Sequence, residues 1–137
     1  MALHLQIITP EKIVFDDEVE QVGLPTTTGQ ITILEKHADL VTQIEPGEIF
    51  LEKNHRVARV AAGFGFARVG KDSVKVLVDL ATPEEEIEEK KIEEAKRQAE
   101  EAIKQKHALS EEEYATAAAN LQKALVQLKI KRRHRRV

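Results

Sequence analysis

The repeat of apolar residues changes once along this chain of 137 residues, at Thr82, and the two repeats belong to different secondary structures. Before that point apolar residues tend to alternate with polar ones, as in SVKVLV at residues 73–78. After it they recur every three or four positions, which is the repeat of an amphipathic α-helix. The sequence therefore predicts an α+β protein, with a strand domain over residues 1–81 and a helical domain over residues 82–137.

The strand domain is divided into short runs by Gly, Pro, Asp and Asn. Segments such as QITIL at residues 30–34 are separated by turn-forming clusters, including Pro46-Gly47. Short strands at intervals of about 8 to 12 residues are typical of a sandwich or a barrel. We predict hairpin turns at EKNHR (52–56) and VGKDS (69–73), where polar residues separate two apolar runs. The first domain is accordingly predicted to be an antiparallel β-sandwich or flattened barrel.

The helical domain opens with residues that commonly start a helix. Thr82 can cap, Pro83 suits the first helical position, and Glu85 completes a capping box with Thr82. We therefore predict that the first helix begins at Thr82. Its apolar stripe is thin and rich in alanine: Ile92, Ala95, Ala99, Ala102 and Ile103.

A second helix is predicted to follow Ser110, which can cap it together with Glu113. Two helices that each carry an apolar stripe can bury the stripes against each other as an antiparallel hairpin. One buried alanine methyl contributes roughly 1 kcal/mol or less, so this hairpin is expected to be marginally stable and mobile. The second stripe comprises Tyr114, Ala118, Leu121, Leu125 and Leu128.

Charge is distributed unevenly over the helical domain. Residues 84–113 carry 12 acidic and 6 basic side chains, a net charge of −6, whereas residues 114–137 carry 7 basic and no acidic ones, a net charge of +7. Opposite charges on adjacent segments predict that the two helices are partners. The final segment, KIKRRHRRV, suggests an alternative function, in which a β-sandwich adaptor holds nucleic acid or anionic lipid by its basic tail. Because the tail has no aromatic residue on which a base could stack, we expect no nucleic-acid partner.

No arrangement of catalytic or metal-binding residues stands out. The chain has no cysteine, and its histidines do not have the spacing of metal ligands. No apolar run approaches the roughly 20 residues that a membrane helix needs. We expect a protein that is not an enzyme, has no metal site and inserts no segment into the membrane. The histidines are His4, His37, His55, His107 and His134.

Three segments together resemble one known family. They are LPTTTGQITILEKHADLVTQIEPGEIFL (24–51), AAGFGFARVGKDSVKVLVDLA (61–81) and EEAKRQAEEA (93–102). In this order and spacing they are similar to the epsilon subunit of the bacterial rotary, F-type, ATP synthase, and the resemblance runs along essentially the whole chain. It implies a non-catalytic subunit of the central stalk, which couples proton-driven rotation to ATP synthesis.

The resemblance also implies partners for each domain. The sandwich would dock on the gamma subunit and the ring of c subunits, with Gln30 and His37 facing them. The hairpin would extend to the beta and alpha subunits and inhibit ATP hydrolysis, at the cytoplasmic face of the bacterial plasma membrane, where the protein would be peripheral. The expected contacts with beta are Lys123, Lys129, Arg132 and Arg133. The stripe exchanged between the first helix and gamma would comprise Tyr114, Ala117, Ala118, Leu121, Leu125 and Leu128.

The sequence departs from this family at a motif that some members use to bind ATP. The family pattern I/L-D-x-x-R-A aligns with IEEKKI at residues 87–92, so Glu replaces Asp, Lys replaces Arg and Ile replaces Ala. Lysine cannot make the planar, bidentate contact of arginine, and isoleucine adds bulk beside a nucleotide. We therefore expect no cofactor, and weak ATP binding by the hairpin is disfavoured.

Overall fold

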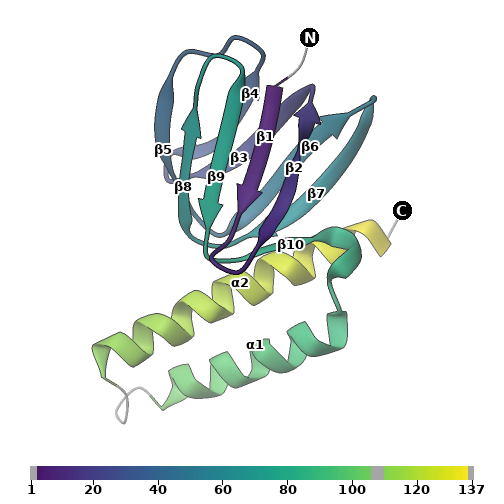
Figure 1. Cartoon of the computed structure of the whole chain (residues 1–137). Helices are drawn as coiled ribbons and strands as arrows, with labels where there is room; N and C mark the ends of the chain where they lie inside the picture. The colour runs from purple at the N-terminus through teal and green to yellow at the C-terminus, as the bar shows by residue number, and fades with distance from the viewer. Residues whose placement is uncertain (1–2, 106–109, 136–137) are drawn as a thin grey trace.

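The computed structural model describes residues 3–105 and 110–135, with side chains as far as Arg132. Within these residues, ten strands precede a short 3-10 helix and two α-helices (Figure 1). The strands are β1 (Leu3–Ile8), β2 (Ile13–Val19), β3 (Gln21–Thr26), β4 (Gly29–Leu34), β5 (Leu40–Ile44), β6 (Gly47–Lys53), β7 (Arg56–Ala62), β8 (Gly65–Val69), β9 (Ser73–Val78) and β10 (Ala81–Pro83). The helices are η1 (Glu84–Glu86), α1 (Glu89–Lys104) and α2 (Glu111–Arg135).

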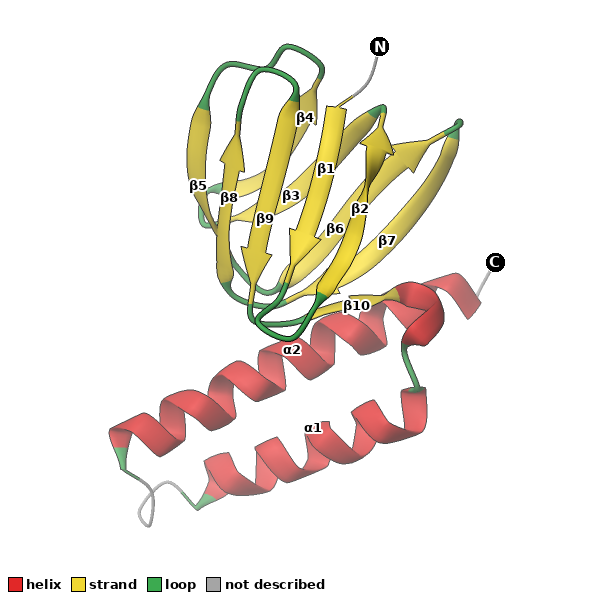
Figure 2. Ribbon diagram, in the orientation of Figure 1, coloured by secondary structure: helices red, strands yellow, loops and turns green. Residues whose placement is uncertain are grey.

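The strands form one sheet that curls over its own core, so the predicted sandwich or flattened barrel is confirmed (Figure 2). Their order is β10-β7-β6-β3-β5-β8-β9-β1-β2, and β4 pairs with β3. Every neighbouring pair is antiparallel except β1 and β9, which run parallel. The sheet is antiparallel, as predicted, except at this one pair. This pair joins the start and the end of the domain, and the local pattern of a strand does not specify so distant a partner.

The inner face of the sheet follows the alternation that the sequence predicts. In β1, Leu3, Leu5 and Ile7 are fully buried while His4 is exposed. Val74 of β9 lies opposite Leu5 and is buried with it. Burying one such side chain contributes about 1.5–3 kcal/mol, and a shift of one residue would expose the whole set. Apolar burial therefore fixes the register.

Both predicted turns are present. Asn54 and His55 join β6 to β7 with φ angles of 54° and 64°, the left-handed values of a type I′ turn. Gly70–Asp72 joins β8 to β9, and the Gly70 N–H donates to the Ser73 carbonyl at 2.8 Å. These turns account for two of the antiparallel pairs.

The predicted helix start at Thr82 is wrong. Thr82 and Pro83 continue the sheet as β10, where they lie opposite Ala61 and Val60 of β7. Edge strands tolerate proline because one side of an edge strand needs no N–H donor. The first α-helix begins only at Glu89, after η1. Pairing with β7 therefore prevails over the local capping signal.

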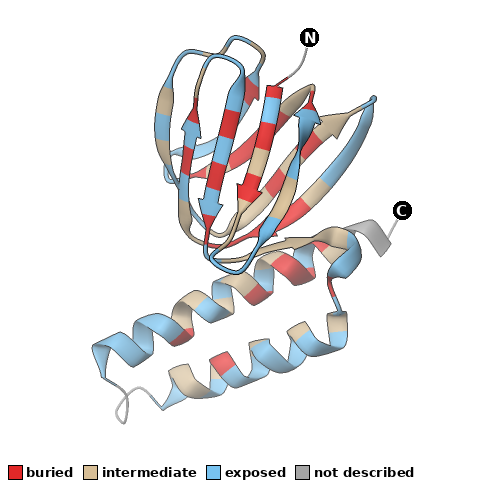
Figure 3. Ribbon diagram, in the orientation of Figure 1, coloured by how far each residue is buried: buried red, intermediate tan, exposed pale blue. Residues whose placement is uncertain are grey.

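The helices form an antiparallel pair, in which α2 lies against the sandwich and α1 lies on the far side of α2 (Figures 1 and 2). The predicted cap of the second helix is confirmed, because the Glu113 N–H donates to Ser110 Oγ at 3.1 Å. Much of α1 is exposed, and Ala99 is its one buried residue (Figure 3). Neither described helix is long and apolar enough to cross a membrane. The first α-helix ends at Lys104, with Gln105 at its C-cap, and residues 106–109 lie outside the described part of the chain.

Candidate functional site

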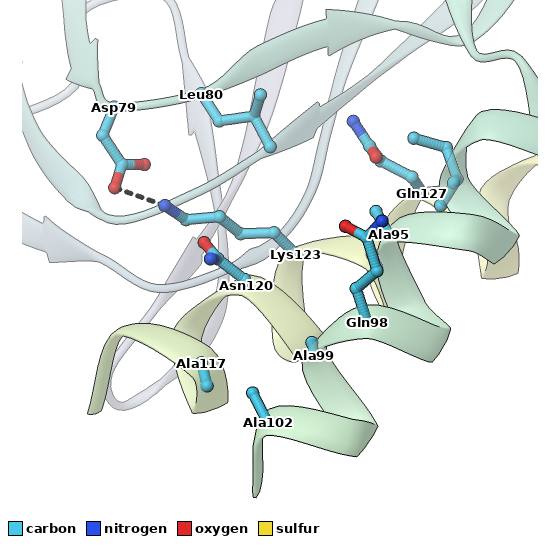
Figure 4. Close-up of a pocket in the computed structure, with 12 residues that line it drawn as sticks. Asp79, Leu80, Ala95, Gln98, Ala99, Ala102, Ala117, Asn120, Lys123 and Gln127 are labelled. Carbon is cyan, nitrogen blue, oxygen red and sulfur yellow. Dashed lines mark hydrogen bonds and ion pairs between the residues drawn. The ribbon is translucent and has the colours of Figure 1, made fainter. Parts of the chain in front are cut away.

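The first candidate site is the interface that attaches α2 to the foot of the sandwich. Lys123 and Gln127 lie one helical turn apart and face the end of the strand domain, at the β9–β10 link and at β10. Lys123 Nζ lies 2.6 Å from Oδ2 of Asp79 (Figure 4). Gln127 Nε2 donates to Oγ1 of Thr82 at 3.0 Å, and Gln127 is buried. Two polar contacts at this spacing fix both the position of α2 and its rotation about its own axis.

An apolar cluster anchors the C-terminal half of α2. Ile130 is buried against Ala61 of β7 and Ile87, which precedes α1. Ile92 and Val126 pack on the edge of this cluster. Because Ala61 has a small side chain, the helix can approach the strand closely. The sandwich and both helices therefore meet at one place.

Ion pairs connect the two helices, as the opposite charges of their sequences predict. Arg132 of α2 donates from Nε to Oε1 of Glu89 at 3.3 Å and from Nη2 to Oε1 of Glu93 at 2.9 Å. These hydrogen bonds, with Glu93 the stronger influence, raise the pKa of Arg132 above its ordinary value. Both carboxylates belong to the first turns of α1, so Arg132 fixes the end of the hairpin opposite its connecting loop.

A cavity of about 520 Å³ opens between the helices and the Asp79-Leu80 segment (Figure 4). Alanine side chains leave this space because they are too short to fill the gap between two helix axes. The predicted marginal hairpin is consistent with such incomplete packing. The alanines that line the cavity are Ala95, Ala99, Ala102, Ala117 and Ala124.

The stripe predicted for the second helix is partly wrong. Ala117 and Leu128 are buried, but Tyr114 and Leu125 are 42% and 44% exposed. A single stripe assumes one neighbour, whereas α2 has two, α1 and the sandwich. Its buried positions therefore spread around the helix, and Ala118 and Leu121 are half-buried between them. The buried residues that the sequence reasoning missed are Ala124, Gln127 and Ile130.

The second candidate site is a row of apolar side chains across four strands of the sandwich, of which three are exposed and Ile8 is half-buried. Phe66 of β8 lies opposite Leu77 of β9, Leu77 lies opposite Ile8 of β1, and Ile8 lies opposite Ile13 of β2. Phe66, Leu77 and Ile13 are 58%, 50% and 57% exposed. We call these four residues the apolar row. Sequence reasoning missed it, although Phe66 and Leu77 occupy outward positions of alternating strands, where polar residues are usual.

A shallow groove of about 350 Å³ adjoins the apolar row. Ile8 and Leu77 of the row contribute to it, together with Pro10, Phe64 and Asp79. The groove therefore reaches the same Asp79 that binds Lys123. The two candidate sites are neighbours.

Comparison with known proteins identifies the family. A family model described as "ATP synthase, Delta/Epsilon chain, beta-sandwich domain" matches residues 2–95. The chain is 35% identical over 130 residues to the ATP synthase epsilon chain of Herpetosiphon aurantiacus, covering 95% of this chain and 94% of that one. The chain belongs to the ATP synthase delta/epsilon family. It is also 36% identical over 135 residues to the epsilon chain of Chloroflexus aggregans, with coverages of 98% and 96%.

Two solved structures of ATP synthases contain chains with this fold. A chain of the Euglena gracilis mitochondrial ATP synthase, solved as OSCP/F1/c-ring, superposes with a TM-score of 0.73 at 21% identity, covering 88% of this chain and 76% of that one. A chain of the Tetrahymena thermophila mitochondrial enzyme, from a structure of its central stalk and c-ring, gives a TM-score of 0.60 at 11% identity, with coverages of 96% and 97%. At these identities the likeness concerns the fold.

The cations expected to contact beta are not grouped in this structure. Lys123 pairs with the sandwich and Arg132 pairs with α1. Lys129 is exposed, and none of the ion pairs among the described residues involves it. The side chain of Arg133 lies outside the described residues. Among the described side chains, Lys123 and Arg132 are thus engaged within the docked hairpin. The role of the four cations toward beta stays a prediction.

The two residues expected to face gamma and the c-ring lie toward opposite ends of β4. Gln30 is exposed in the first half of this strand. His37 follows its end, in a turn where its Nδ1 donates to the Ala38 carbonyl at 2.7 Å. The distance along β4 separates the two side chains, so they would not contact the same point of a partner. Their assignment to that interface stays a prediction.

The residues around the cavity do not fit ATP well. Lys123 is the one cationic residue that lines it, and Asp79 already binds this ammonium group. Lys91, in the motif position where the family has arginine, is exposed and pairs with Glu88 instead. A triphosphate needs several cationic or N–H donors close together. Weak ATP binding by the hairpin stays disfavoured as a prediction.

One cluster of possible metal ligands lies elsewhere, at the β6–β7 turn. Ligand atoms of Glu20, Glu52 and His55 lie within 4.8 Å of one another. Glu20 accepts a hydrogen bond from the His55 backbone N–H, and Glu52 accepts one from Gln21. Because the His55 ring is 91% exposed, water competes for these groups, and no function is assigned to them.

Proposed function

We propose that this chain is the non-catalytic epsilon subunit of the central stalk of a proton-translocating ATP synthase. Its sandwich would bind the gamma subunit and the c-ring. Its hairpin would extend to beta and alpha and inhibit ATP hydrolysis. The protein would be peripheral, at the cytoplasmic face of the bacterial plasma membrane. The observation that carries this proposal is the apolar row, because a stalk subunit must present a face that a partner covers.

The apolar row has the composition of an interface core. Its exposed members remove apolar surface from water when a partner covers them, which favours association. The neighbouring row of the same sheet face is polar, with Arg68 opposite Lys75 and Lys75 opposite Gln6. An apolar centre beside a polar rim is the usual anatomy of a protein interface. We assign this face to gamma.

The hairpin has the properties of an inhibitory element that moves. Among the described residues, its contacts with the sandwich include one ion pair, one side-chain hydrogen bond and one small apolar cluster. The alanine-lined cavity further lowers the apolar area buried between the helices. Elements with few buried apolar contacts open at low free-energy cost. Release would expose the cations of α2 to acidic surfaces of beta.

Substitution of the apolar row tests the docking face. The double variant Phe66→Ser with Leu77→Ser is expected to weaken binding to isolated gamma at least about tenfold, because two central apolar contacts are lost. The matched control is Val57→Ser on β7, which replaces an equally exposed side chain away from the row. Calorimetric titration gives both affinities. Unchanged binding by the double variant would show that gamma docks elsewhere.

Truncation tests the inhibitory role. A chain that ends at Glu88 retains β10 and Ile87 but loses both α-helices. Reconstituted into the synthase, it is expected to bind gamma normally and to give faster ATP hydrolysis than the full chain, because the hairpin is absent. Steady-state hydrolysis is the measurement. An unchanged rate with normal assembly would contradict the inhibitory role.

The alternative function, a basic adaptor for nucleic acid or anionic lipid, is less well supported. Lys123 and Arg132 already bind carboxylates within the chain. This arrangement favours protein carboxylates over phosphates as the partners of α2. Mobility of a DNA duplex at moderate salt separates the two functions. Tight retardation that resists salt would favour the adaptor.

A further inference from the structure

The sandwich orients the carboxylate that holds Lys123 before α2 is in place. Oδ1 of Asp79 accepts the backbone N–H of Phe64 at 3.0 Å. The Asp79 backbone N–H donates to the Phe64 carbonyl at 2.9 Å. Oδ2 then lies 2.6 Å from Lys123 Nζ. Since two hydrogen bonds within the sandwich already order Asp79, forming the ion pair costs less conformational entropy than pairing two mobile side chains.

Lys123 lies close against the backbone of the β7–β8 connection. A Cβ added at Gly63 would lie 2.1 Å from Oδ1 of Asp79 and 3.0 Å from Cε of Lys123. Only glycine leaves room for both groups here. Beyond this point Nζ lies 5.8 Å from the centre of the Phe64 ring, within range of a cation–π interaction. The sandwich thus surrounds the end of the lysine side chain on two sides.

We propose that the Asp79–Lys123 ion pair is the latch that keeps the hairpin docked, and that release requires Lys123 to exchange Asp79 for an acidic surface on a partner protein. This inference rests on the proposed function. This ion pair joins α2 directly to the sandwich, whereas Arg132 binds α1.

The exposure of the latch suits a reversible contact. The Lys123 side chain is 19% exposed and that of Asp79 is 46% exposed. Water therefore reaches the carboxylate, and breaking the pair leaves no unpaired charge in an apolar interior. A fully buried ion pair would make release of the hairpin too costly, whereas a fully exposed one would contribute little to the stability of the docked state.

The latch also borders the proposed docking face. Asp79 and Phe64 line the groove beside the apolar row, together with Ile8 and Leu77 of the row itself. A protein bound in this groove would contact the two residues that hold Lys123. Docking on the sandwich and release of the hairpin would then affect each other, and such coupling is reciprocal.

Hydrogen exchange of the full chain, followed by mass spectrometry, tests the latch without the rest of the enzyme. Asp79→Asn and Lys123→Gln are each expected to raise exchange of α2 amides about two- to fivefold. Strand amides should stay protected, which shows that each variant is folded. The matched control Asp17→Asn removes an exposed ion pair with Lys53 inside the sandwich and should leave α2 unchanged. Unchanged α2 exchange in both latch variants would overturn the proposal.

The assembled enzyme separates failure of the latch from failure of the proposed function. Asp79→Asn leaves Lys123 available to the partner, so inhibition of ATP hydrolysis should increase about two- to fivefold. Lys123→Gln removes the cation from both states and should not increase inhibition. If Asp79→Asn raises α2 exchange but not inhibition, the latch is supported and the inhibitory role fails. If α2 exchange is unchanged while truncation at Glu88 still accelerates hydrolysis, the inhibitory role is supported and the latch is wrong.

Discussion

At the scale of single residues, the sandwich contains positions where glycine leaves space for a side chain of the neighbouring strand. Phe50 of β6 lies opposite Gly23 of β3, and its ring covers that glycine. A Cβ added at Gly23 would lie 2.0 Å from Cε1 of Phe50. The aromatic ring therefore lies flat on the sheet face instead of pointing away from it. Glycine is therefore needed at position 23, because the Phe50 ring of the neighbouring strand occupies the space that a side chain would fill.

Gly23→Ala is expected to lower the free energy of unfolding by about 1–3 kcal/mol, because the Phe50 ring must leave its position. Chemical denaturation measures the change. The double variant Gly23→Ala with Phe50→Ala is the control, since the added methyl then has room. In a chain that already carries Phe50→Ala, Gly23→Ala should lower the free energy of unfolding by much less than it does when Phe50 is present. Additive costs would contradict the proposed clash.

At the scale of elements, α2 is the helix on which both domains depend. Ala117 and Ala124 line the cavity that α2 shares with α1, while Gln127 and Ile130 contact the sandwich. A helix with two neighbours buries residues on more than one side, so its apolar residues do not form one stripe. Exposure of Leu125 is a consequence of this division.

A larger side chain in the cavity is expected to hold the hairpin more firmly. Ala102→Leu would add apolar area within the space between the helices and stabilise the docked state by about 0.5–1.5 kcal/mol. Slower hydrogen exchange in α1 and α2 is the expected result. Ala115→Leu, at an exposed position of α2, is the matched control and should have little effect. Faster exchange in Ala102→Leu would show that the cavity cannot accept the larger side chain.

At the scale of the whole molecule, the hairpin is attached by contacts of different kinds along α2. The ion pair of Lys123 lies at the middle of α2, whereas the apolar cluster at Ile130 lies near its C-terminal end. Salt weakens exposed ion pairs but strengthens or preserves apolar burial. The two halves of the helix should therefore respond differently to ionic strength.

Raising KCl from about 0.1 M to 1 M shortens the screening length from about 10 Å to 3 Å. Amide exchange is expected to accelerate first in the half of α2 that precedes Lys123, with smaller changes around Ile130. Hydrogen exchange at several salt concentrations measures the gradient along the helix. A uniform response along α2 would show that the ion pair does not control the first half.

The sequence by itself determined the architecture and the family. Alternation in strands such as β1 specified which side chains are buried, the turn residues at Asn54 and His55 specified a hairpin, and the segments from Leu24 to Ala102 identified the relatives. These features depend on neighbours within a few residues or on motif order. Local physical chemistry is sufficient to read them.

Only the tertiary structure decided how the two domains meet. In the folded chain Thr82 belongs to the sheet, and α2 contacts two neighbours with different faces. Lys123 pairs with Asp79, which lies 44 residues away along the chain. Such contacts depend on which surfaces the folded domains bring together. The apolar row arises in the same way, because the parallel pairing of β1 with β9 aligns two strand pairs that are distant in sequence, β1–β2 and β8–β9. No local pattern contains that alignment.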